Sequence, residues 1–149
     1  MKVIVSDPIS DDGLDIFKQN NIGIIDATDI EIDENYEHIE SANGWVIRSG
    51  TTLDASIIKK ADSLSVIGRA GVGIDNVDIS AATRKGVVVM NTPDANTISA
   101  AEHTLALILS LSRNVSIGHH SLLAGNWDRH KFVGSEIRNK TLRLLESMN

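Results

Sequence analysis

Short apolar runs alternate with more polar, helix-compatible segments over the first ninety residues. Runs rich in valine and isoleucine predict strands at residues 2–6, 22–26, 44–47, 64–67 and 87–90. Helical patterns fall between them at residues 13–18, 33–41, 53–61 and 78–85. Thr52 is the expected N-cap of the third of these helices.

Strands that alternate with helices in this way are typical of parallel sheets built by right-handed crossovers. We therefore expect an α/β fold in which helices cover both faces of a parallel five-stranded sheet. Ligands of such sheets bind beyond the carboxyl ends of the strands. Polar residues at these predicted ends include Asp7, Arg48, Arg69 and Asn91, so this edge is where we expect the chemistry.

The pattern changes after residue 90. A turn-rich connector, residues 91–96, precedes a strongly aliphatic helix expected from Thr97 to Arg113, where Ser99 and Glu102 have capping-box spacing. A second helix is expected at residues 116–124, and residues 141–148 predict a short helix or strand. We place a domain boundary at about residue 96, giving units of residues 1–96 and 97–149.

Composition narrows the class of protein. The chain has 149 residues, no cysteine and a net charge of −6. The negative charge disfavours a general nucleic-acid binder, and the missing thiols exclude disulfides and thiolate metal sites. No apolar run reaches membrane-spanning length, and the first residues do not resemble a signal peptide. We expect a cytoplasmic protein that binds neither nucleic acid nor membrane.

A glycine-rich loop follows the fourth predicted strand. Its glycine amides, the start of the next helix and the fixed charge of Arg69 together favour an anion. The loop differs from a dinucleotide fingerprint because Asn76 stands where glycine or alanine is needed, and the next strand ends in Asn91 rather than an acid. We interpret it as a carboxylate-binding loop that uses the Val72 and Gly73 amides. A plain tight turn is the alternative.

Arginines stand at two neighbouring strand ends. Arg48 and Arg69 are placed to hold the phosphate of a small acidic ligand through charge-assisted hydrogen bonds. The alternative is that each forms an ordinary surface ion pair in an acidic protein. The five histidines form no pattern of metal ligands, and no nucleophile triad or pair of catalytic carboxylates has convincing spacing. We therefore assign no metal site.

Several motifs, in order, resemble the D-2-hydroxyacid dehydrogenase family. They are Val46-Ile47-Arg48-Ser49-Gly50-Thr51, Gly68-Arg69-Ala70-Gly71-Val72-Gly73-Ile74-Asp75-Asn76-Val77-Asp78, Asn91-Thr92-Pro93, Ser99-Ala100-Ala101-Glu102-His103 and Gly125-Asn126-Trp127-Asp128-Arg129. The resemblance implies a flavodoxin-like substrate-binding domain at residues 1–96. It also implies that residues 97–149 are the leading helices of an incomplete Rossmann, NAD-binding domain.

The resemblance further implies a ligand and its contacts. The ligand is a small phosphorylated 2-hydroxy acid, which the family oxidises at C2 while hydride passes to NAD. The implied substrate-binding residues are Arg48, Ser49, Arg69, Val72, Gly73, Asn96 and Arg129. Arg129 is carried over as a phosphate contact that can reach a neighbouring subunit.

The family's glycine fingerprint and its catalytic arginine, glutamate and histidine have no counterpart in these residues. We therefore expect no catalytic residue and no bound NAD in this chain, and no activity from it alone. A homodimer is expected through the helix from Thr97 to Arg113. The rival interpretation is a non-catalytic dimerising or interaction fragment that takes no small-molecule ligand.

Overall fold

The computed structural model describes residues 1–33 and 36–144. By their internal contacts they form two compact units, Met1–Asn96 and Thr97–Asn149. The elements of the first unit are β1 (Lys2–Val5), α1 (Asp11–Gln19), β2 (Gly23–Asp26), β3 (Gly44–Ile47), α2 (Ala55–Lys60), β4 (Val66–Arg69), α3 (Ile79–Lys85) and β5 (Val88–Asn91). Those of the second are α4 (Thr97–Ser112), α5 (Val115–Leu123) and the 3-10 helix η1 (Arg129–Lys131).

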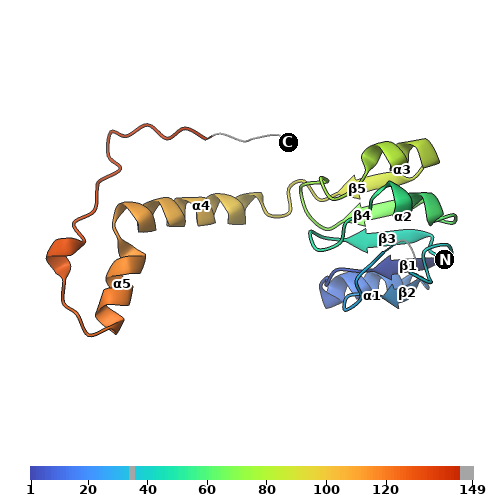
Figure 1. The fold of residues 1–149 in the computed structure, drawn as a ribbon, viewed down its shortest axis with the longest axis horizontal. Coiled ribbons are helices and arrows are strands. Elements are labelled where there is room, and N and C mark those ends of the chain that lie inside the picture. The colour runs from blue at the N-terminus through green and yellow to red at the C-terminus, as the bar shows by residue number, and fades with distance from the viewer. Residues whose placement is uncertain (34–35, 145–149) are drawn as a thin grey trace. The chain divides into compact units, whose positions relative to one another are not determined.

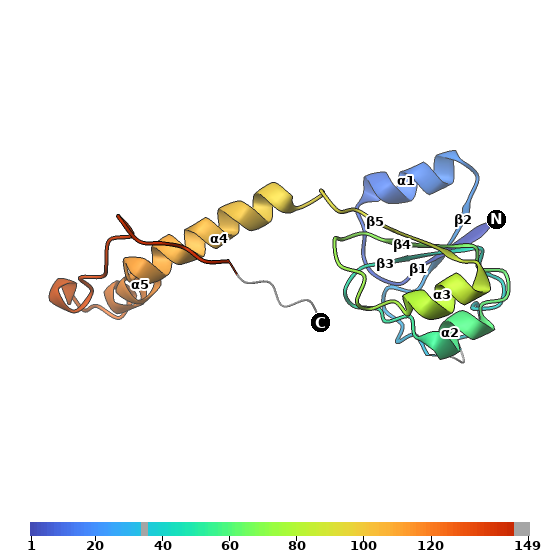
Figure 2. The same ribbon diagram turned by 90° about the horizontal axis from the view of Figure 1, so that it is seen from above.

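The first unit is a five-stranded sheet in the order β2-β1-β3-β4-β5, and every neighbouring pair is parallel (Figure 1). Helix α1 lies on one face of the sheet, and α2 and α3 lie on the other (Figure 2). This order changes direction between β1 and β3, which is the flavodoxin-like arrangement. The predicted fold class is confirmed.

The core lies between the sheet and the helices α2 and α3. Trp45, Ile47 and Ile67 point from the central strands into one buried cluster, which Ile58 and Ala82 complete from the two helices. The alternation of buried positions along β3 and β4 follows from the two-residue period of a strand. The opposite face is less covered.

Two residues of the edge strand β5 show that the face of the sheet opposite the core is less covered. Val88 is 56% exposed and Met90 is 55% exposed. Helix α1 packs beside β2, at the other edge of the sheet, and buries none of its own residues fully.

Helix α2 begins two residues later than predicted. Its N-cap is Asp54 rather than Thr52, since the Asp54 carboxylate accepts the amides of Ser56 and Ile57 at 2.9 and 3.0 Å. The Ile57 amide, aided by the Ser56 hydroxyl, lowers the pKa of Asp54. A carboxylate two or three residues before the amides it accepts is the usual N-cap geometry, so the threonine assignment was wrong.

The helix predicted at residues 33–41 is also wrong. Described residues 37–41 form turns, and Tyr36 donates its amide to Asp33 in a bond that spans three residues. Ile39 is buried in the core, and Tyr36 packs against it while partly buried. These two positions provide only a narrow apolar stripe, so a regular helix gains little by packing here.

The second unit consists of α4, α5 and the segment that follows them. Helices α4 and α5 contact each other, and Ser135 returns to donate its amide to the Ser112 carbonyl at 2.6 Å. Helix α4 starts at Thr97, as predicted. Ser99 then lies inside the first turn rather than at the cap, so its capping-box role with Glu102 is not supported.

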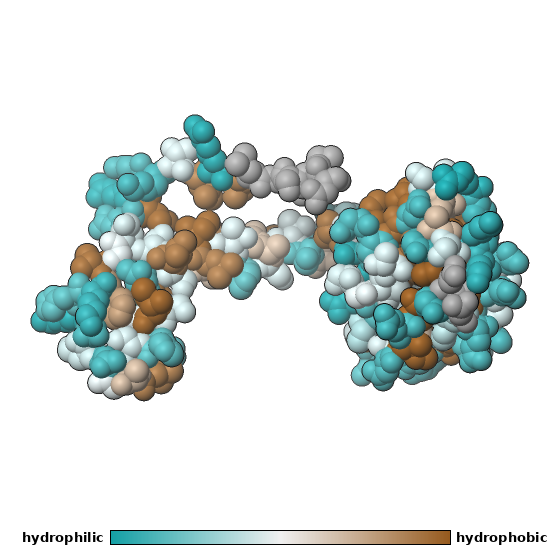
Figure 3. Space-filling view, viewed as in Figure 1, coloured by the Kyte–Doolittle hydropathy of each residue, from teal (hydrophilic) through white to brown (hydrophobic). Residues whose placement is uncertain are grey.

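Most apolar side chains of this unit are exposed. In Figure 3 they gather over α4 and α5, and α4 buries none of its residues. Residues 141–144 form neither helix nor strand, and the rest of the predicted last element lies outside the described residues. Within the described residues, no helix combines the length and the apolar character needed to cross a bilayer.

Candidate functional site

Three strand ends meet at one edge of the first unit. In the ladder, Ile47 of β3 pairs with Arg69 of β4, which pairs with Asn91 of β5. The residues that follow these positions therefore emerge side by side. The structure brings together the loop after β3, residues 48–51, and the glycine loop after β4, residues 70–76.

The loop after β3 is held from β1 by Asp7. The Asp7 Oδ2 atom accepts the amide of Arg48 at 2.6 Å and the amide of Thr51 at 3.1 Å. The amides of Ser49 and Gly50, between these two, have no hydrogen-bond partner within the described part of the chain. They are donors available to a ligand.

A buried hydroxyl pair lies beneath this loop. The Ser6 Oγ atom accepts the Trp45 indole N–H at 3.0 Å and the Thr51 hydroxyl at 2.9 Å. Ser6, Asp7 and Thr51 are the buried polar residues of the described chain, and all three serve this loop. Buried polar groups are stable only when paired, so this network fixes the loop to the core.

The glycine loop is tied to its neighbours on both sides. The Asn76 Nδ2 atom donates to the carbonyls of Arg48 and Thr51, both at 2.6 Å. On the other side, Asn91 Nδ2 donates to the Val72 carbonyl at 2.7 Å. The amides of Val72 and Gly73 have no partner among residues 1–33 and 36–144.

Arg69 lies against the glycine loop. A Cβ atom at Gly71 would lie 3.0 Å from the Arg69 Cζ atom and closer still to Nη1. The Arg69 Nε atom is buried and has no hydrogen-bond partner in the described structure. Arg48 is exposed, and its Nη1 atom donates to the Pro8 carbonyl at 3.3 Å. Neither arginine forms an ion pair within the described residues, so the surface ion-pair alternative has no support there.

Unpaired amides and the Arg69 guanidinium lie at this edge of a protein of net charge −6, together with the carboxylates of Asp7 and Asp75. Oriented backbone N–H groups and arginines are the usual donors to carboxylate and phosphate. This arrangement can bind and orient a small dianionic acid.

The start of the next helix is partly engaged. The Asp78 carboxylate caps α3 by accepting the Ala81 amide at 2.8 Å, so this amide is not available to a ligand. A carboxylate there would also repel a pyrophosphate. Asn76 and Asn91 are both engaged with backbone carbonyls.

Two predicted contacts lie apart from these loops in sequence. Asn96 is the last residue of the first unit, in the connector after β5. Arg129 belongs to the second unit, where it begins η1 and lines a cavity of about 210 Å³ with Trp127 and Phe132.

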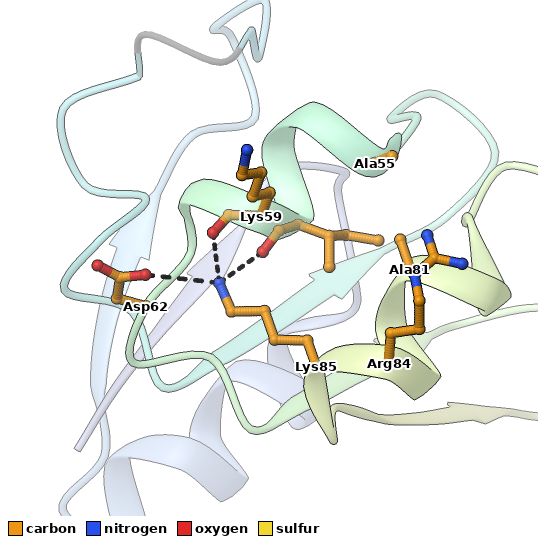
Figure 4. A pocket seen from close by; sticks show the side chains of 7 residues that line it. Ala55, Lys59, Asp62, Ala81, Arg84 and Lys85 are labelled. Carbon is orange, nitrogen blue, oxygen red and sulfur yellow. Dashed lines mark hydrogen bonds and ion pairs between the residues drawn. The ribbon is translucent and has the colours of Figure 1, made fainter.

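The cavity between α2 and α3 does not offer the same chemistry. A cavity of about 420 Å³ lies between α2 and α3, where Lys85 donates to the Ile58 and Lys59 carbonyls and pairs with Asp62 at 3.7 Å (Figure 4). Its partly buried ammonium thus caps the end of α2. No group of three metal-ligating side chains occurs in the described residues.

Sequence reasoning found the arginines and the glycine loop but missed the role of Asn76. The spacing of motifs treats Asn76 as a departure from a fingerprint, whereas its partners lie 25 and 28 positions away. Asp7 was visible as a polar strand end. Its two amide partners became evident only from the fold.

Comparisons with known proteins give the same fold and family. The family model for the catalytic domain of D-isomer specific 2-hydroxyacid dehydrogenases matches residues 3–146. The D-3-phosphoglycerate dehydrogenase of Methanocaldococcus jannaschii is 44% identical over 146 residues, covering 97% of this chain and 28% of that protein. The chain thus spans less than a third of that relative.

Solved structures agree. A crystal structure from Thermus thermophilus superposes with a TM-score of 0.82 and 27% identity, covering 92% of this chain and 46% of that one. NAD⁺-bound 3-phosphoglycerate dehydrogenase of Entamoeba histolytica gives a TM-score of 0.62 and 29% identity, covering 76% of this chain and 39% of that one. The resemblance in the motifs is therefore confirmed, and the chain belongs to the D-isomer specific 2-hydroxyacid dehydrogenase family.

Proposed function

We propose that this chain is the substrate-binding portion of an NAD-dependent D-3-phosphoglycerate dehydrogenase and that it binds 3-phosphoglycerate. The observation that carries the proposal is the pair of loops with unpaired amides, at Ser49, Gly50, Val72 and Gly73, beside Arg69. The name of the 44% identical relative supports this choice of acid.

The two anionic ends of this acid suit different parts of the edge. The carboxylate is received by the Val72 and Gly73 amides, and the phosphate by Arg48, Ser49 and Arg69. Guanidinium groups provide planar donors that match phosphate oxygens. Asn96 and Arg129 are proposed as further substrate contacts, with Arg129 directed to the phosphate.

The proposed role is binding and orientation. The complete reaction would oxidise 3-phosphoglycerate to 3-phosphohydroxypyruvate, a step of serine biosynthesis in the cytoplasm, with NAD supplying the hydride acceptor. Proton transfer needs a base within hydrogen-bonding reach of the reacting hydroxyl. We assign no such base here, and the glycine loop departs from the dinucleotide fingerprint at Asn76. We propose that residues 1–149 alone neither bind NAD nor turn over substrate.

The test is isothermal titration of the chain with 3-phosphoglycerate and, separately, with NAD. We expect saturable binding of the acid that is lost in Arg69→Ala. The matched control is Arg84→Ala, which removes the same charge from the exposed surface of α3. Equal weakening by both variants would indicate general electrostatics, and absence of binding to the wild-type chain would refute the proposed ligand.

A second function is favoured by the exposed helices of the second unit. Leu105 is 56% exposed, Leu109 is 47% exposed and Leu111 is 83% exposed. Apolar surface of this kind usually marks an interface. We propose a homodimer through the helix from Thr97 to Arg113. Were the dimer to form without any binding of the acid, the non-catalytic interaction fragment would be the better description.

A further inference from the structure

The loop at residues 48–51 is held at both ends by side chains from elsewhere in the chain. Asp7 accepts the amides of Arg48 and Thr51, and Asn76 donates to the carbonyls of the same two residues. Each end residue therefore has both of its backbone polar groups fixed. The amides of the two central residues, Ser49 and Gly50, have no hydrogen-bond partner in the described structure.

Asp7 acts here as an acceptor. The residue is 8% exposed, and one carboxylate oxygen accepts both amides. The loop also approaches it closely, since a Cβ at Gly50 would lie 3.4 Å from the Asp7 Cγ atom and closer to Oδ1. The negative charge itself opposes an anionic ligand nearby.

Asn76 acts as a double donor. Its two amide hydrogens serve two carbonyls 2.6 Å away, while its Oδ1 atom is buried and unpaired in the described residues. An unpaired buried acceptor costs stability, so this side chain is placed for its donors. Aspartate has the same shape but would place an oxygen against each carbonyl.

We propose that Asp7 and Asn76 are positioning residues of the anion site. Together they fix the loop so that the Ser49 and Gly50 amides stay available, and Asn76 couples this loop to the glycine loop. The inference rests on the proposed function for its ligand, 3-phosphoglycerate, but the geometry of the loop can be measured without that ligand.

The experiment combines titration of 3-phosphoglycerate with amide hydrogen exchange measured by NMR. The variants are Asp7→Asn, Asp7→Ala and Asn76→Asp. The charge-matched control is Asn43→Asp, because Asn43 accepts the Lys2 amide at 2.9 Å near the amino ends of the strands, and aspartate keeps that acceptor.

A positioning role predicts a specific order of affinities. Asp7→Ala and Asn76→Asp should weaken binding about tenfold or more, since each removes two bonds that hold the loop. Asp7→Asn keeps an acceptor oxygen and removes the opposing charge, so its affinity should equal or exceed that of the wild type. Asn43→Asp should change affinity less than about threefold.

Hydrogen exchange in the unliganded wild-type chain tests the geometry of the loop at residues 48–51 independently of the ligand. We expect slow exchange at the Arg48 and Thr51 amides and fast exchange at Ser49 and Gly50. Fast exchange at all four overturns the inference even if a variant fails to fold. So does wild-type affinity in Asp7→Ala and Asn76→Asp, or an Asp7→Asn variant as weak as Asp7→Ala. A protected loop in a chain that binds no acid refutes the proposed function while leaving the loop geometry intact.

Discussion

Replacing Gly71 with alanine should separate anion affinity from stability. The added Cβ would lie 3.0 Å from the Arg69 Cζ atom and closer to Nη1, whereas carbon atoms in contact are about 3.5–4.0 Å apart. The guanidinium must therefore move by roughly 0.5–1 Å or more. The neighbouring backbone need not move, because the obstructing atoms are the end of a flexible side chain.

The expected loss of affinity follows from that movement. Hydrogen bonds to charged groups contribute about 1.5–3 kcal/mol and lie within a narrow range of distances. Displacing Arg69 from its place beside the loop should weaken 3-phosphoglycerate binding by roughly tenfold to a hundredfold. Stability should change by less than about 1 kcal/mol, because alanine also restricts the unfolded chain.

The assay pairs calorimetric titration with urea unfolding, and Gly68→Ala is the control. Gly68 lies on β4, three residues earlier, and a Cβ there would meet nothing within 4 Å. We expect this variant to bind as the wild type does. Unchanged affinity in Gly71→Ala would show that Arg69 does not serve the ligand from its observed position. A large loss of stability would show that the loop is more tightly packed than described.

Three further substitutions test the stability of the fold and the proposed dimer. Asp54→Ala should lower the free energy of unfolding by about 1 kcal/mol. The amides of α2 lower the pKa of Asp54, so its stabilising contribution is present above the unfolded-state pKa and is lost as the pH falls through the folded-state pKa. Urea titrations of the wild type and the variant should therefore converge in acid. Ser6→Ala leaves the Trp45 indole and the Thr51 hydroxyl without their buried acceptor and should cost about 1–3 kcal/mol by thermal unfolding; a smaller loss would mean that solvent reaches them. Leu111→Glu places a charge on the exposed face of α4 and should make the chain monomeric in sedimentation velocity, and a persistent dimer would place the interface elsewhere.

The strands were predictable because their cause is local. Runs such as Val3-Ile4-Val5 bury almost completely, on both faces of the strand, and a short continuous apolar run bounded by turns is the signal of such a strand. The helix at residues 33–41 failed because polar helix formers alone do not create a packed stripe. The cap of α2 was misplaced by two residues because Thr52 and Asp54 both suit an N-cap, and only the amides they meet distinguish them.

Some residues of the candidate site could likewise be predicted from the sequence, and others could not. Arg48 and Arg69 could be found from the sequence, because polar residues after parallel strands share one edge of the sheet. The function of Asn76 could not, since it bonds to carbonyls of a loop that precedes it by more than twenty positions. Every residue has a backbone carbonyl, so the sequence does not show which residues accept these hydrogen bonds.

Since Asn76 and Asp7 bind backbone atoms of the loop at residues 48–51, the frame of the two loops does not depend on the side chains of Ser49 and Val72. Ser49 and Val72 are both exposed, and the frame takes no hydrogen bond from either side chain. Exchanging them would alter what the loops recognise and leave the scaffold unchanged. The edge can therefore be redesigned for a different acid by substitution at these two positions, without rebuilding the sheet beneath.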